Sequence, residues 1–222
     1  MPKNQKKTFR RKKTAPRRRR KKIKHQFIQA LQPIYRTQLK YVDYKHITLD
    51  TANPEGSFVF RLNDLFDPDY TATGHQSKYR DQFYQLYNYG RVMAVSIKII
   101  YTHDDKNPIR LIAGPNGDNY VSSFSAFSED RKVQKRLITQ DRSCMTYYKT
   151  YVDKHLGNKK GTWQTDNSFE QSSSGTLANT ASCWYSVNLS RFFTVQVIST
   201  VCMQVEIKQL VEFSGQVPFG QS

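Results

Sequence analysis

The chain has 222 residues, a length that suits one large domain with a tail or two small domains. Its 35 Lys and Arg against 18 Asp and Glu give a net charge of +17, and such an excess is typical of proteins that bind polyanions, nucleic acid above all. The content of 14 Tyr and 13 Phe excludes a wholly disordered chain. No apolar run reaches about 18 residues, and none follows the basic N-terminus, so we expect neither membrane insertion nor a secretory signal.

The positive charge is concentrated at the N-terminus. Residues 1–24 contain 14 Lys and Arg and no acidic residue, whereas residues 25–222 contain 21 Lys and Arg against 18 Asp and Glu, a net charge of only +3. A segment with this much like charge and so few apolar residues cannot offset the entropy that it would lose on ordering. We therefore expect two parts, a disordered basic arm at 1–24 and a single folded domain at 25–222.

The arm is suited to non-specific binding of phosphate, because each Lys or Arg that neutralises a phosphate releases a condensed counterion whatever the base. Its basic clusters also match a nuclear-import signal. The alternative is a solubilising tail without a specific partner, although mixed charge would solubilise equally well. The arm residues expected to contact nucleic acid are Arg10, Arg11, Lys12, Lys13, Arg17, Arg18, Arg19, Arg20, Lys21, Lys22 and Lys24.

Two further lysines follow the arm closely. Lys40 and Lys45 are interleaved with Tyr41 and Tyr44. Lysines in this pattern can hold phosphates while the bases of a single strand stack on the tyrosines, so both are predicted nucleic-acid contacts. The alternative is an ordinary strand whose tyrosines belong to the core.

Beyond the arm, β-branched and aromatic residues are separated by Asn, Asp, Gly and Pro, which is typical of an antiparallel β-protein. Residues 39–50 contain little that favours helix. In residues 58–62, Phe58, Phe60 and Leu62 share one face, which predicts a short strand with one buried side. A long loop follows this strand.

The next strand is predicted at 91–101. Alternation places Met93, Val95, Ile97, Ile99 and Tyr101 on its buried face, and Val92, Ala94, Ser96, Lys98 and Ile100 on the other. Residues 194–213 also read as strand, but they are too many for one ordinary strand unless a bulge bends it.

The remaining strands are predicted at 109–113, 119–127, 132–139, 144–152 and 182–189, with turns or breaks at 114–117, 157–158 and 171–175. Helix signals are weak throughout. About eight strands with long loops at uneven intervals favour a double-sheet jelly roll over a compact barrel with tight hairpins. The predicted fold class is therefore all-β, a single eight-stranded antiparallel jelly roll (a β-sandwich) with a disordered basic N-terminal arm.

Catalytic and cofactor motifs are missing. The chain has neither a Gly-x-x-x-x-Gly-Lys-Ser/Thr phosphate loop nor a Gly-x-Ser-x-Gly motif, and its five histidines are widely separated. Its three cysteines, Cys144, Cys183 and Cys202, form no Cys-x-x-Cys pair and are expected to be small apolar residues inside strands. We therefore expect no enzyme, no cofactor and no metal site.

One stretch of about 45 residues closely resembles capsid proteins of small circular single-stranded DNA viruses, the circovirus-like group. The motifs that carry the resemblance are FRLNDLFDPD at 60–69, GHQ at 74–76, DQ at 81–82, LY at 86–87 and SIKII at 96–100. Such proteins have an Arg/Lys-rich arm followed by a single jelly roll, the order expected here. The chain departs from the group at Ser77, where relatives often have proline, and at Arg80, where they often have a small or aromatic residue.

The resemblance implies a viral coat protein that self-assembles into an icosahedral shell of about sixty identical subunits (T=1), with the arms inside. It also implies a circular single-stranded DNA genome as partner, residence in the virion, passage through the host nucleus and contact with nuclear-import receptors. The host attachment factor stays unassigned. About sixty arms would place on the order of 840 positive charges inside the shell, enough to neutralise much of a small genome. The alternative is a cellular nucleic-acid-binding protein of ribosomal or single-strand-binding type with a basic tail.

The motif at 60–69 and the histidine that follows it form the candidate assembly loop. Its Asn and Asp residues are turn formers, and Phe66 is a candidate anchor in a pocket of a neighbouring subunit. The alternative is a loop folded onto its own subunit. Three nearby carboxylates suit calcium, but hydrogen-bonded turns explain them as well, and the histidine is expected to be a hydrogen-bonding loop residue. The candidate residues are Asn63, Asp64, Phe66, Asp67, Asp69, His75 and Gln76.

Overall fold

The computed structural model describes residues 33–70, 75–103, 105–117, 123–140, 142–175, 177–192 and 198–217. The basic arm at 1–24, with all eleven of its predicted contacts, lies outside these residues. The strands are β1 (Ile34–Leu49), β2 (Glu55–Arg61), β3 (Tyr87–His103), β4 (Ile109–Asn116), β5 (Gln134–Ile138), β6 (Cys144–Tyr151), β7 (Trp184–Arg191) and β8 (Ser199–Gln216). The helices are α1 (Arg80–Tyr84), α2 (Phe124–Ser128), α3 (Val152–Leu156) and α4 (Thr162–Thr165), with 3-10 turns at Asn167–Phe169 and Asn179–Ala181.

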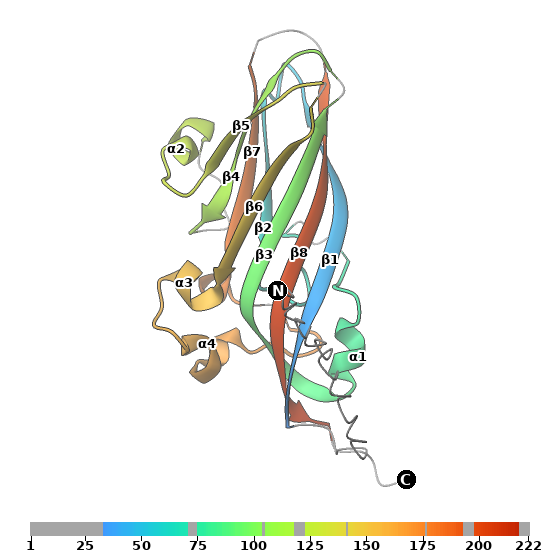
Figure 1. The fold of residues 1–222 in the computed structure, drawn as a ribbon, viewed down its shortest axis with the longest axis vertical. Helices are drawn as coiled ribbons and strands as arrows, with labels where there is room; N and C mark the ends of the chain where they lie inside the picture. Colours follow the sequence, from blue (N-terminus) through green and yellow to red (C-terminus); the bar gives the residue numbers. More distant parts are fainter. Residues whose placement is uncertain are drawn as a thin grey trace, which may run out of the picture. The chain divides into compact units, whose positions relative to one another are not determined.

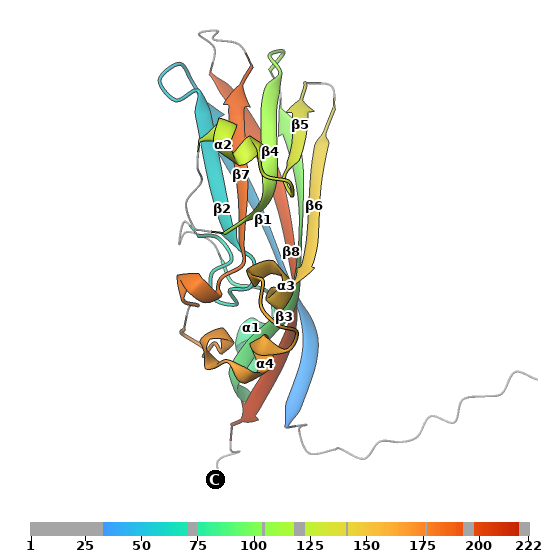
Figure 2. The same ribbon diagram turned by 90° about the vertical axis from the view of Figure 1, so that its left-hand side faces the viewer.

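The eight strands form two four-stranded antiparallel sheets that face each other (Figures 1 and 2). One sheet has the order β1-β8-β3-β6, and the other has the order β2-β7-β4-β5. The chain passes repeatedly from one sheet to the other, so neighbours within a sheet are not consecutive in sequence, except for β4 and β5. This interleaved order is that of a double-sheet jelly roll, and the predicted fold class is confirmed.

The core fills the space between the sheets. The inward residues of β3 and β8 alternate with outward ones, whereas β7 lies in the middle of its sheet and all eight of its residues are buried. Large side chains of this core with exposed fractions of 0–2% include Val95, Ile97, Ile99, Val187, Leu189, Val205, Ile207 and Phe213. Because both sheets contribute to one continuous cluster, neither sheet can bury its apolar face alone.

The predicted faces of β3 are confirmed over most of the strand and wrong at its start. Val95 and the alternate residues up to Tyr101 are buried, as expected, but Val92 is buried at 2% exposure and Met93 is only half-buried. The pairing of β3 with β8 shifts register between Val92 and Ala94. A bulge inserts one unpaired residue and moves every side chain before it to the opposite face. The last predicted strand was too long for an ordinary strand unless a bulge bends it; β8 runs for 18 residues, and the register shift of its pairing with β3 lies in β3.

A turn was predicted at 114–117, but β4 continues through Gly114 and Pro115 to Asn116. Proline has no N–H to donate, so within a sheet it is confined to positions where no neighbour needs one. The strand β5 pairs with β4 only as far as Ala113, and beyond that residue β4 is bonded to β7 alone. The sheet is locally an edge there, which explains how Pro115 is accommodated.

A strand was predicted at 119–127, and this prediction is wrong for the part that the structure describes. Residues Phe124–Ser128 form the short helix α2. The hydroxyl of Ser123 accepts a hydrogen bond from the N–H of Ala126 at 3.4 Å and thereby caps the helix. Serine is a preferred residue at this position because its oxygen satisfies an N–H that the helix leaves without a partner.

Two of the three cysteines lie inside strands, as predicted, and the third lies outside a strand. Cys144 and Cys202 lie in β6 and β8, and Cys183 is fully buried just before β7; all three are free thiols. In the described part of the chain, no helix has the length and apolar character needed to cross a membrane.

Candidate assembly loop and nucleic-acid interface

The candidate assembly loop turns back on the strand that precedes it. The N–H of Arg61 donates to the carbonyl of Pro68 at 2.9 Å, and Phe60 forms a bridge with Asp69. Asp64, with an exposed fraction of 0%, lies inside this turn and accepts hydrogen bonds from the N–H groups of Phe66 (2.7 Å) and Asp67 (3.1 Å). The expected Asx-type turn is therefore present, and its carboxylate is buried.

The second oxygen of Asp64 joins two other parts of the same domain. It forms an ion pair with Arg61 Nη1 at 2.7 Å and accepts the N–H of Leu177 at 3.4 Å. The guanidinium of Arg61 also lies near the rings of Tyr70 (5.3 Å) and Trp184 (5.1 Å). Both oxygens of Asp64 thus have partners in their own chain.

Asn63 ties the loop to the entry of β7. Its exposed fraction is 1%, its amide nitrogen donates to the carbonyl of Ala181 at 2.8 Å, and its amide oxygen accepts the N–H of Cys183 at 2.6 Å. An asparagine is suited to this position because one side chain supplies both a donor and an acceptor. The loop is folded onto its own domain along this edge, as the alternative interpretation expected.

Two glutamines that the sequence analysis did not single out satisfy the backbone of the loop. Gln171 accepts the N–H of Leu65 at 2.7 Å and donates to the carbonyl of Asn63 at 2.9 Å. Gln209, on β8, donates to the carbonyls of Leu62 (2.9 Å) and Asp64 (2.7 Å). Both are at most 2% exposed, and a buried loop needs such partners because its peptide groups are removed from water.

Phe66 packs against an arginine of its own chain. The guanidinium of Arg80, a residue with 2% exposure, lies 5.1 Å from the ring of Phe66 and 4.6 Å from that of Tyr84. It also donates to Gln76 at 3.2 Å and pairs with Asp81 at 2.7 Å. Phe66 is partly buried and contacts Arg80 of its own chain, and its predicted contact with a neighbouring subunit stays a prediction.

Lys45, a predicted nucleic-acid contact, is enclosed by carboxylates. Its ammonium pairs with Asp43 at 2.9 Å and with the fully buried Asp69, and its side chain is 14% exposed. Burial opposes the charge of Lys45, but its bonds to Asp69 and Asp43 outweigh that effect and raise its pKa. The charge of Lys45 is thus neutralised within the domain.

Lys40 and the neighbouring tyrosines have different surroundings. Lys40 is 51% exposed and pairs with Glu206 on β8 at 2.6 Å. Tyr41 belongs to the core with 0% exposure, as the alternative interpretation expected, whereas Tyr44 is 65% exposed. His75 is exposed and stacks on the ring of Tyr41 at 4.7 Å.

The carboxylate of Asp67 is destabilised in its charged form. Burial raises its pKa, and the charges of Asp69 and Asp64 raise it further. Calcium would relieve such repulsion, but Asp64 and Asp69 are already bound to Arg61 and Lys45. Within the described residues, no group of three or more metal-ligating side chains is arranged to hold an ion. The contacts favour the hydrogen-bonded turn over the calcium site.

His155 is a partly buried titratable group that no sequence motif identified. It lies in α3, and its Nδ1 is 3.1 Å from the hydroxyl of Tyr148. Burial lowers the pKa of His155 to about 4.

Because the folded pKa of His155 is below the unfolded value of about 6.5, the unfolded chain binds the extra proton between these pH values. We expect stability to fall as the pH drops from 6.5 to 4, by no more than about 3 kcal/mol from this group. Denaturant titrations at several pH values measure the free energy of unfolding, which should change less with pH for His155→Gln than for the unchanged protein. His46→Gln, on the exposed side of β1, is the matched control and should keep the unchanged slope.

The fold of the chain is similar to that of several solved viral structures. No protein-family model matches the chain, and no curated protein matches it. A chain of Desmodium yellow mottle tymovirus is 11% identical, with a TM-score of 0.45, and the match covers 86% of this chain and 93% of that one. The nodavirus of the giant freshwater prawn Macrobrachium rosenbergii, solved as a semi-empty virus-like particle, is 10% identical with a TM-score of 0.48. That match covers 99% of this chain and 97% of the nodavirus chain. A chain of Mud crab tombus-like virus is 8% identical with a TM-score of 0.47, and the match covers 96% of this chain and 94% of that one.

Proposed function

We propose that the protein is the coat subunit of a small virus, a structural protein that assembles with copies of itself into a closed icosahedral shell and packages a circular single-stranded DNA genome. The observation that carries the proposal is the separation of charge. Residues 1–24 hold 14 cations and no acid, while residues 25–222 are nearly balanced at +3. The folded domain is a jelly roll of two interleaved sheets.

This separation suits a shell on electrostatic grounds. Subunits with their charge spread over every side would repel one another laterally, whereas a nearly neutral domain can pack against its copies. A flexible cationic arm can meanwhile neutralise phosphates without reading base sequence. The resemblance of residues 58–102 to circovirus-like capsid proteins supports DNA as the genome. The basic clusters of the arm support recognition by nuclear-import receptors and assembly in the host nucleus.

Electron microscopy of the purified full-length protein tests this proposal. Uniform closed particles that contain nuclease-protected single-stranded DNA are the expected result. A monomer that binds nucleic acid without forming particles at any salt concentration would contradict it, and would favour a cellular nucleic-acid-binding protein instead. Protected RNA in uniform particles would retain the coat function and overturn the assignment of the genome.

A further inference from the structure

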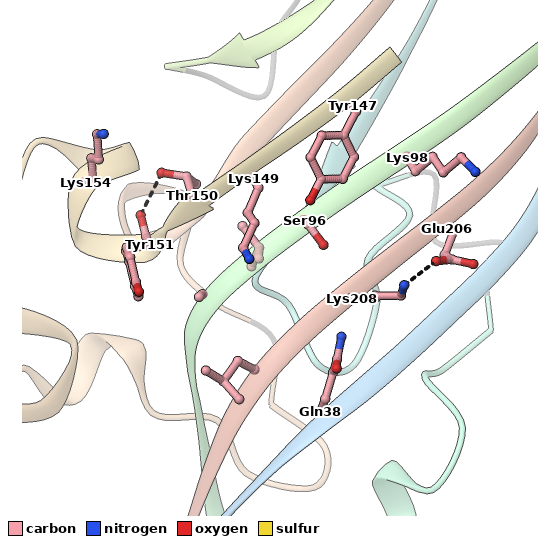
Figure 3. A pocket seen from close by; sticks show the side chains of 13 residues that line it. Gln38, Ser96, Lys98, Tyr147, Lys149, Thr150, Tyr151, Lys154, Glu206 and Lys208 are labelled. Carbon is pink, nitrogen blue, oxygen red and sulfur yellow. Dashed lines mark hydrogen bonds and ion pairs between the residues drawn. The ribbon is translucent and has the colours of Figure 1, made fainter. Parts of the chain in front are cut away.

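The outer face of the sheet β1-β8-β3-β6 carries a row of lysines across its four strands. Lys40 on β1 is directly opposite Lys208 on β8, Lys208 is opposite Ser96 on β3, and Ser96 is opposite Lys149 on β6. Neighbouring strands lie about 4.8 Å apart, so these positions are close. Figure 3 shows Lys149, Ser96 and Lys208 side by side on this face.

An adjacent row adds another cation. Glu206 on β8 is opposite Lys98 on β3, and Lys98 is opposite Tyr147 on β6. Lys154, from α3, lines the same open hollow of about 780 Å³. We call this surface the lysine face, and it consists of Lys40, Lys98, Lys149, Lys154 and Lys208 with the exposed rings of Tyr147 and Tyr151.

The charge of the lysine face is only partly compensated. Glu206 pairs with Lys40 at 2.6 Å and with Lys208 at 2.8 Å. Among the residues that the structure describes, no acidic side chain forms an ion pair with Lys98, Lys149 or Lys154. Five cations against one acid give +4 on this face, which exceeds the +3 of residues 25–222 as a whole. Lys40 and Lys208 are directly opposite each other, and the shared Glu206 compensates only one of their two charges.

The lysine face also offers aromatic rings to solvent. Tyr147 is 50% exposed and Tyr151 is 66% exposed, and both flank Lys149 on the same side of β6. Alternating cations and exposed aromatic rings suit a single strand, whose phosphates pair with the lysines while its bases stack on the rings. A double helix keeps its bases stacked internally and can use only the cations. The two rings therefore favour unpaired nucleic acid over other polyanions.

The lysine face is continuous with the arm along the chain. Residue 24 is joined to the start of β1 by nine residues, which span at most about 32 Å. Lys40 lies seven positions into β1, and Gln38 beside it lines the same hollow. At most about this length of chain therefore separates residue 24 from the strand that carries Lys40.

We propose that the lysine face is a second binding surface for single-stranded nucleic acid, formed by the folded domain and separate from the arm. The surface binds the phosphodiester backbone through its lysines and stacks unpaired bases on Tyr147 and Tyr151. This inference rests on the proposed packaging function. It adds that the folded domain, and not the arm alone, contacts the genome.

The first experiment measures oligothymidine binding by full-length protein over a range of salt concentrations. A triple variant with Lys98→Gln, Lys149→Gln and Lys154→Gln removes the three lysines that form no ion pair. Each lost phosphate contact lowers the steepness of log K against log salt by about 0.7, so the slope should become shallower by about 2. The matched control replaces the exposed Lys106, Lys132 and Lys135 by Gln and should leave the slope unchanged. Equal slopes for the two triple variants would overturn the inference.

The second experiment tests stacking. Tyr147→Ala and Tyr151→Ala should each weaken oligothymidine binding by about 5- to 100-fold and change duplex binding much less. Tyr89→Ala is the matched control, since Tyr89 is 43% exposed on the same sheet but is opposite Ser214 rather than a lysine. If the tyrosine variants bind both forms as the unchanged protein does, while the lysine variant weakens heparin and DNA alike, the face is a general polyanion site and the inference is wrong.

A third measurement separates nucleic acid from a second copy of the chain. Lysine acetylation should be slower at Lys98 and Lys149 in filled particles than in particles emptied of nucleic acid. Equal protection in both would show that another subunit covers the face, which would contradict the inference. Particle formation, seen in the same micrographs, reports on the coat function independently of the lysine face.

Discussion

Replacing Asp64 with alanine is expected to lower the free energy of unfolding by about 3–5 kcal/mol, the usual cost of removing one partner of a buried ion pair. The carboxylate is fully buried and pairs with Arg61, whose side chain is 11% exposed. Its removal also leaves the N–H groups of Phe66, Asp67 and Leu177 without their acceptor. Urea denaturation at pH 7 measures the difference.

Two further substitutions serve as a control and as an intermediate case for Asp64→Ala. Asp130→Ala changes an exposed aspartate and should shift the free energy of unfolding by no more than about 0.5 kcal/mol. Asp64→Asn keeps one oxygen for the N–H groups of Phe66 and Asp67 but loses the charge beside Arg61, so its effect should be intermediate. An Asp64→Ala variant as stable as Asp130→Ala would show that the loop is not held by this carboxylate.

The fold was predictable from local sequence because the sandwich buries one face of most strands. Alternation identified the inward residues of β2 and most of β3, and these determine how the sheets pack. The bulge between Val92 and Ala94 was not predictable, because both valine and methionine suit a buried position and only the pairing with β8 decides between them. Likewise, Pro115 signals a turn unless it is known that β5 begins opposite Ala113 and leaves the rest of β4 without a partner on that side.

The candidate loop was predictable in part. Asn63 and Asp64 were identified as turn formers, which their bonds bear out, because an Asx turn is a local feature. Their distant partners were missed, since Gln171 and Gln209 lie more than 100 residues away in sequence. Nothing local distinguishes these two glutamines from exposed ones, and only the strand order brings them under the loop.

The two departures from the circovirus-like pattern also have internal contacts. Ser77 is 3% exposed and donates to the side chain of Gln209 at 3.2 Å. Arg80 is buried against Phe66 and donates to the carbonyls of Ser172 and Ser173. Ser77 thus connects the segment before α1 to β8, and Arg80 connects α1 itself to the loop at Phe66 and to residues 172–173.

Deleting residues 1–24 is expected to remove most of the nucleic acid from assembled particles while leaving the folded domain intact. The deletion takes away 14 cations and none of the residues that form the two sheets. If ten of these cations contact phosphates, the salt slope for single-stranded DNA should become shallower by about 7. The absorbance ratio of purified particles at 260 and 280 nm and the amount of nuclease-protected DNA measure the loss.

A shuffled arm separates charge from sequence. A full-length variant with residues 3–24 in random order keeps all 14 cations, and it should package as much DNA as the unchanged protein because counterion release is indifferent to their order. A variant with the same residues in order but with the cations replaced by glutamine should behave like the deletion. Truncated particles that retain their full DNA content at physiological salt would contradict the role of the arm. Packaging would then have to be carried by the folded domain, and the lysine face would be the surface to change next.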